Sequence, residues 1–251
     1  MTTKTKNMTT YEDKHKLTRE ENLFVAKKEI SRSIWSSVNL EGFNMTFADT
    51  ETVLNHGRLA NADPDAIICV NNLKRGWAHM LKHVDDALTV DFLAKINGIV
   101  AANDSLDPGR LRTGEGGIRG TSYKPSIWTH EQVTKELDTI AKISGVTNRA
   151  LRFFIWSCKS QMWWDGNKRT SLLAANKILI EAGHGILLID TNDLNEFNNV
   201  LHDFYEHDNE GNLLDFLHNK AICAGDLENG RNNEKSASLE AECRYRTRRM
   251  V

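Results

Sequence analysis

Prolines, cysteines and long apolar runs are scarce in this sequence. Only three of its 251 residues are proline, and apolar residues recur at helical spacing, so we expect a mostly helical fold. The four cysteines lie far apart without a Cys-x-x-Cys pair, which argues against zinc sites and disulfides and fits a reducing cytoplasm. No apolar run reaches membrane-spanning length. We therefore expect no membrane partner. Because the formal net charge is only −2, we expect no general affinity for nucleic acid, although the basic end of the tail leaves nucleic-acid or partner binding as an alternative.

The most informative stretch is Asp165-Gly166-Asn167-Lys168-Arg169, which directly precedes an apolar run with helical spacing. We expect a helix to begin at about Asn167. The first backbone N–H groups of this helix have no partner within the helix. Together with Lys168 and Arg169 they favour the binding of an anion. Gly166 would let a phosphate approach the backbone, and Asp165 would suit Mg²⁺. The alternative is an ordinary capped helix start that carries two surface cations.

Together with the preceding Trp163-Trp164, this stretch resembles the second part of the Fic signature, His-Pro-Phe-x-Asp/Glu-Gly-Asn-Gly/Lys-Arg. Fic enzymes mostly transfer AMP from ATP to a hydroxyl group of a target protein, and the Doc members transfer phosphate. The resemblance implies that the ligand is ATP with Mg²⁺ and that Asp165 binds the metal ion. It also implies that Gly166, Asn167 and Arg169 surround the nucleotide phosphates, and Lys168 matches the variant found in Doc-like members.

Two departures from the signature affect the expected chemistry. Gln161 stands at the place of the family His, which is the general base, and Met162 stands at the place of the Pro. A Gln side chain does not titrate near neutral pH, and losing a positioned base costs about a hundred- to ten-thousand-fold in rate. Leu172 replaces a second Arg that binds the γ-phosphate in many members. We therefore expect a retained phosphate pocket with AMP transfer lost or strongly reduced.

A second motif, Ser37-Val38-Asn39-Leu40-Glu41-Gly42, ends a helix expected over residues 17–40. It is similar to the inhibitory Ser/Thr-x-x-x-Glu-Gly/Asn motif of self-regulated Fic proteins, whose Glu points into the nucleotide site. The resemblance implies that Ser37, Glu41 and Gly42 form such a motif. Since Leu172 replaces the usual Arg partner, Glu41 is expected to pair with Arg169 or with nothing. Without the resemblance, Glu41 is an ordinary exposed carboxylate.

Residues 108–125 contain five glycines and two prolines, which exclude a helix. We expect residues 110–113 and 118–122 to pair as a hairpin. The run resembles the Fic flap, whose pattern is met at Pro108, Gly109, Arg112, Ile118, Gly120, Tyr123 and Pro125. The resemblance implies that Arg112, Ile118, Gly120 and Tyr123 dock a target segment, which adds as a strand. The alternative is a glycine-rich surface loop.

The fold expected from these patterns is an all-α Fic helical bundle with one β-hairpin flap. Residues 1–16 form a flexible leader, residues 17–223 the Fic domain with an inhibitory helix at about 17–42, and residues 224–251 a disordered tail with a basic end. The further helices are expected over residues 43–56, 66–84, 90–100, 129–143, 149–159, 167–182, 191–206 and 213–223.

Two hypotheses for the function follow. The first is a nucleotide-binding, adenylyltransferase-like protein that Glu41 inhibits and whose transfer is weak or lost. The second is a non-enzymatic protein that binds a partner, either the target protein or the other member of a toxin–antitoxin pair, as an antitoxin-like or regulatory member.

Overall fold

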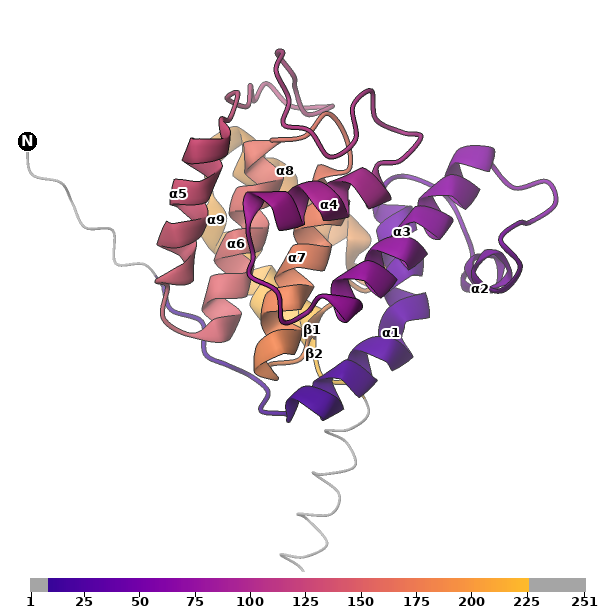
Figure 1. Cartoon of the computed structure of the whole chain (residues 1–251), viewed down its shortest axis with the longest axis horizontal. Coiled ribbons are helices and arrows are strands. Elements are labelled where there is room, and N and C mark those ends of the chain that lie inside the picture. Colours follow the sequence, from indigo (N-terminus) through magenta and orange to yellow (C-terminus); the bar gives the residue numbers. More distant parts are fainter. Residues whose placement is uncertain (1–8, 226–251) are drawn as a thin grey trace, which may run out of the picture.

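The computed structural model describes residues 9–225 and shows a helical bundle (Figure 1). Its α-helices are α1 (Arg19–Leu40), α2 (Phe47–His56), α3 (Pro64–Lys82), α4 (Val90–Val100), α5 (His130–Ala141), α6 (Val146–Ser160), α7 (Asn167–Ala182), α8 (Leu194–His207) and α9 (Glu210–Phe216). A 3₁₀ turn, Thr191–Asp193, precedes α8, and a π-helical turn, Leu217–Ala221, follows α9. Two short strands, β1 (Ile186–Leu187) and β2 (Ile222–Cys223), pair antiparallel.

Helix α7 lies at the centre of the bundle and packs against α1, α3, α4 and α6. Every residue from 169 to 180 is buried, because apolar side chains occupy all sides of this helix. Leu172 and Leu179 face the core that α5, α6, α8 and α9 share, whereas Leu173 and Ile180 face the core formed with α1–α4. The central position of α7 places its N-terminus between the two halves of the molecule.

The C-terminal end of α7 lies in close contact with the segment that precedes α1. Gly183 ends the helix in the left-handed conformation, with φ 78°. Its carbonyl accepts from the Leu17 backbone N–H at 2.8 Å, and a Cβ at Gly183 would lie 2.2 Å from the Leu17 carbonyl oxygen. Only glycine fits this approach, so the start of α1 is held against the end of α7.

Residues 9–16 belong to this packed body rather than to the flexible leader that we expected. Tyr11 is buried, and its hydroxyl donates to Asp215 at 2.7 Å. The backbone N–H of Thr147 donates to Asp13 at 2.7 Å, which joins the segment to α6. One aromatic ring and one acidic side chain thus anchor a stretch whose polar composition suggested solvation. Residues 1–8, and residues 226–251 of the expected tail, lie outside the described residues.

The predicted hairpin within residues 108–125 is wrong. In that run Leu111 forms an isolated antiparallel bridge with Trp163, and β1 and β2 are the strands that pair among the described residues. A high glycine content excludes a helix but does not determine which groups the backbone hydrogen-bonds to. Here the Arg112 backbone N–H donates to the Met162 carbonyl rather than to a second strand of a hairpin. The last expected helix, 213–223, likewise ends earlier, and its final residues form β2.

The other helices lie where the spacing predicted them, with shifted ends. Helix α4 has the predicted bounds and α7 begins at the predicted residue, whereas α6 begins three residues before the expected position 149. Within residues 9–225, no helix combines enough length and apolar character to cross a bilayer.

Candidate functional site

The Asp165–Arg169 stretch forms the loop and first turn at the N-terminus of α7. Gly166 precedes the helix in the left-handed conformation, with φ 71°, and no side chain caps the helix start. The Asn167 side chain closes the loop from within: its Oδ1 accepts from the Trp163 N–H at 3.0 Å, and its Nδ2 donates to the Trp163 carbonyl at 3.0 Å. The first N–H groups of α7 are therefore left for an anion, while the Asn167 amide is engaged in shaping the loop.

Asn97 of α4 holds this loop in place through hydrogen bonds. The sequence alone did not indicate this role of Asn97. It is fully buried, and its Nδ2 donates to the Asp165 carbonyl at 2.8 Å and to Thr170 Oγ1 at 3.1 Å. Its Oδ1 accepts from the Gly109 N–H at 2.8 Å. One side chain thus ties α4 to the loop, to α7 and to the start of the glycine-rich run. An amide on the apolar face of a helix was the signal that could have identified it.

Arg169 points into the protein toward the end of α4. Only 4% of its side chain is exposed, and its Nη1 donates to the Val100 carbonyl and to Asp104 Oδ2, both at 2.7 Å. Its Nη2 donates to Asp165 Oδ1 at 2.9 Å. Burial alone would lower the pKa of Arg169, but neighbouring acidic groups, Glu41 foremost, raise it above the usual value. Asp104, which follows the end of α4, is therefore a main partner of this cation.

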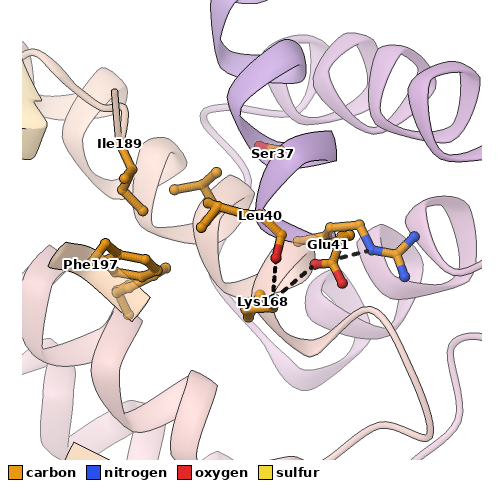
Figure 2. Close-up of a pocket in the computed structure, with 9 residues that line it drawn as sticks. Ser37, Leu40, Glu41, Lys168, Ile189 and Phe197 are labelled. Atoms are coloured by element: carbon orange, nitrogen blue, oxygen red, sulfur yellow. Dashed lines mark hydrogen bonds and ion pairs between the residues drawn. The ribbon is translucent and has the colours of Figure 1, made fainter. Parts of the chain in front are cut away.

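Glu41 lies against the same cations, at the end of α1. Its Oε1 is 3.8 Å from Arg169 Nε and 3.8 Å from Lys168 Nζ, and Lys168 Nζ donates to the Leu40 carbonyl at 2.7 Å. Figure 2 shows Leu40 and Glu41 reaching from α1 over Lys168. Of the two alternatives expected for Glu41, pairing with Arg169 or with nothing, the structure shows the ion pair with Arg169. Ser37 donates to the Ser33 carbonyl at 2.7 Å, and Gly42 follows the helix with φ 92°.

The end of α1 fills the space over the N-terminus of α7. A cavity of about 10 Å³ remains there, lined by Ser37, Leu40, Glu41, Phe154, Lys168, Arg169, Leu172, Ile189 and Phe197. This volume holds about one water molecule, so no larger ligand fits between these residues in this arrangement. Leu172, at the position of the second Arg of the signature, contributes an apolar wall to the cavity.

Gln161 lies at the entrance to the loop with both ends of its amide engaged. Its Nε2 donates to the Cys158 carbonyl at 2.7 Å, and its Oε1 accepts from Asn167 Nδ2 at 3.2 Å. The backbone is left-handed, with φ 43°, and ends α6. The side chain therefore orients the loop and offers no titratable group to a reacting hydroxyl.

Of the four residues expected to dock a target, Arg112 is buried, Ile118 and Tyr123 are half-buried, and Gly120 is exposed. Arg112 is 3% exposed; its Nε donates to the Gln161 carbonyl at 3.1 Å and its Nη2 to the Ser126 carbonyl at 2.9 Å. Ile118 packs on the core, Tyr123 stacks on Tyr205 at 6.4 Å, and the Gly120 carbonyl accepts from His202 Nε2 at 3.0 Å. Arg112 is thus a structural anchor of the glycine-rich run, and Gly120 and Tyr123 hold that run onto α8.

Asp165 is the candidate for a metal ligand. Its side chain is 48% exposed, and one carboxylate oxygen already accepts from Arg169 and from the Gly166 N–H. Among residues 9–225 no group of three or more His, Cys, Asp or Glu side chains is arranged to hold a metal ion. Mg²⁺ is usually bound by one or two carboxylates together with substrate phosphates, so Asp165 by itself could hold the ion only beside a bound phosphate.

Known proteins are similar to this chain in fold. No family model matches the sequence, and no curated protein matches it. A Fic domain-containing signalling protein from Bacteroides thetaiotaomicron superimposes with a TM-score of 0.66 and 18% identity, over 80% of this chain and 84% of that one. A Glu-to-Gly variant of a Fic-1 fragment from C. elegans superimposes with a TM-score of 0.65 and 16% identity, over 84% of this chain and 67% of that one. A Fic family protein from Desulfovibrio desulfuricans superimposes with a TM-score of 0.60 and 17% identity, over 80% of this chain and 62% of that one.

These similarities show the fold. The chain has the fold of Fic domain proteins, as the helical pattern and the loop motif together predicted. A shared fold leaves activity to be argued from the site itself.

Proposed function

We propose that this chain is a self-inhibited, nucleotide-binding Fic protein related to protein adenylyltransferases, with AMP transfer lost or strongly reduced. The observation that carries the proposal is the contact of Glu41 and Leu40 with Lys168 and Arg169. An acidic side chain and a backbone carbonyl occupy the space in which nucleotide phosphates would meet those cations. Such a contact favours a protein that binds an anion when α1 moves aside.

The residues of the loop suit a nucleotide phosphate once the inhibitory end of α1 is displaced. The uncapped N-terminus of α7 offers backbone N–H groups, and Lys168 would exchange the Leu40 carbonyl for a phosphate oxygen. The half-exposed Asp165 would hold Mg²⁺, which neutralises phosphate charge. Arg169 is engaged by Asp104 and Asp165, so its contribution is to position the loop as well as to add positive charge.

The expected weakness of transfer rests on Gln161. Without a base, the target hydroxyl keeps its proton until the leaving group departs. The rate of transfer is then lower by about a hundred- to ten-thousand-fold. Positioning and charge stabilisation remain, and these supply much of the catalysis in phosphoryl-type transfers. A residual activity under a released Glu41 is consistent with this chemistry.

A second candidate is a non-enzymatic protein that binds a partner, as an antitoxin-like or regulatory member of a pair. It is favoured by the engagement of Gln161 at both ends of its amide and by the apolar Leu172 at the place of a phosphate-binding Arg. Both features stabilise the closed site without serving a transfer reaction.

Calorimetric titration with ATP and Mg²⁺ separates the two candidates. The parent is compared with Glu41→Gly and Glu41→Gln, and Glu20→Gln is the matched control because it removes an acidic charge from the other end of α1. We expect both Glu41 variants to bind at least about tenfold more tightly than the parent, which corresponds to about 1.4 kcal/mol of inhibitory contact. Unchanged affinity in both variants would refute nucleotide binding under self-inhibition and favour the partner-binding candidate.

A further inference from the structure

Arg169 leaves few of its hydrogen-bond donors for a ligand. Its Nη1 donates to the Val100 carbonyl and to Asp104, and its Nη2 donates to Asp165. Its Nε is buried without a hydrogen-bond partner within residues 9–225, and it faces Glu41 Oε1 at 3.8 Å beside the cavity under the end of α1. A buried donor without an acceptor costs free energy, so this atom marks a place where a ligand would supply an acceptor.

The other free donors lie at the same end of α7. Lys168 Nζ donates to the Leu40 carbonyl at 2.7 Å, and an ammonium group has two further donors. No side chain caps the helix start, so its first backbone N–H groups remain available. The two carboxylates beside Arg169 already balance its charge, so Lys168 and the helix N-terminus supply most of the attraction for an anion. This set of donors suits one phosphate group rather than a chain of three.

Apolar side chains form the rest of the cavity wall. Each of the following is at most 5% exposed: Phe154, Leu172, Ile189 and Phe197. Leu40 packs on the same core, and Figure 2 shows its side chain pointing toward Ile189 and Phe197. Displacing the end of α1 would therefore open an apolar space directly beside the free donors. A second or third phosphate along this wall would lose its hydration without a cation beside it, which is unfavourable.

We propose that the released site selects a nucleoside monophosphate over the triphosphate. This inference rests on the proposed function and names its ligand more narrowly. The single phosphate accepts from Arg169 Nε, from Lys168 and from the first N–H groups of α7, because charged hydrogen bonds in a partly dry site are strong. The nucleoside takes the place of Leu40 against the apolar wall. Since protein donors meet the charge of one phosphate, this binding does not require Mg²⁺.

The test compares three ligands in calorimetric titrations of the full chain carrying Glu41→Gly: AMP without Mg²⁺, ATP with Mg²⁺, and adenosine. We expect AMP to bind at least about tenfold more tightly than either of the others. Tighter binding of ATP, or adenosine that binds as tightly as AMP, overturns the inference and leaves the proposed function standing. If neither nucleotide binds, the proposed function falls together with the inference.

Leu172→Arg in the same background tests the apolar wall. The added cation should raise the affinity for ATP relative to AMP at least about tenfold, whereas the matched control Leu172→Met adds no charge and should keep the preference for AMP. An unchanged ratio in a folded Leu172→Arg variant overturns the inference. Lys168→Gln, at a position whose side chain is 30% exposed, serves should that variant fail to fold. It should weaken AMP at least about tenfold and leave adenosine unchanged, and an equal loss for both ligands overturns the inference.

Discussion

The Asp104→Asn substitution tests whether Asp104 neutralises the buried Arg169. The change keeps the shape of the side chain and one acceptor oxygen but removes the negative charge. A hydrogen bond to a charged group contributes about 1.5–3 kcal/mol and a neutral one about 0.5–1.5 kcal/mol, so the pair itself loses about 1–2 kcal/mol. Breaking a buried pair costs more when no other partner remains, about 3–5 kcal/mol. Because Asp165 and Glu41 still face Arg169, we expect a loss of about 2 kcal/mol in the free energy of unfolding.

Urea unfolding followed by tryptophan fluorescence measures this loss, and thermal unfolding should show a decrease of about 4–8 °C in Tm. Asp107→Asn is the matched control in the same loop. Asp107 pairs with Arg110 at 3.5 Å, and the two side chains are 49% and 78% exposed, so its removal should change stability by less than about 0.5 kcal/mol. Equal effects of the two substitutions would refute the assignment of Asp104 as the partner that stabilises Arg169.

Three further predictions concern transfer, pH and the glycine-rich run. Gln161→His combined with Glu41→Gly should raise AMP incorporation into protein at least tenfold over Glu41→Gly alone, measured with labelled ATP; no gain would show that another feature silences the site. Burial raises the pKa of Tyr11 from 10 to about 12. Between about pH 10 and 12 only the unfolded chain loses this proton, so the free energy of unfolding should fall as the pH rises. Tyr11→Phe should reduce this pH dependence, measured by urea unfolding at several pH values. Gly114→Ala places a Cβ 2.8 Å from Trp164 and should lower stability and change the tryptophan emission, whereas an emission spectrum like that of the parent would contradict this packing.

Local pattern was sufficient for most helices. The spacing of apolar residues predicted α4 with its observed bounds, and in the structure Thr89 caps its start, since Thr89 Oγ1 accepts from the Phe92 N–H. The start of α7 followed from the change between a polar loop and an apolar run. The same reasoning failed for residues 110–122, where composition excluded a helix but a buried arginine, Arg112, determines the path of the backbone.

The site was predictable in part. The sequence indicated Lys168, Arg169 and Glu41 as neighbours through a motif, and the structure places them together. It did not indicate Asn97 or Asp104, because an amide on an apolar helix face and an acidic residue in a turn have many ordinary explanations.

The sequence alone determined the helical class of this protein, the start of α7 at Asn167 and the absence of a titratable group at Gln161, because each depends on residues close together in the chain. Tertiary structure decided which charges meet: Lys168 reaches a carbonyl 128 positions away, and Arg169 an acidic group 65 positions away. Periodicity tells which face of a helix is buried but not which helix covers it, and packing against a particular neighbour brings these groups into contact.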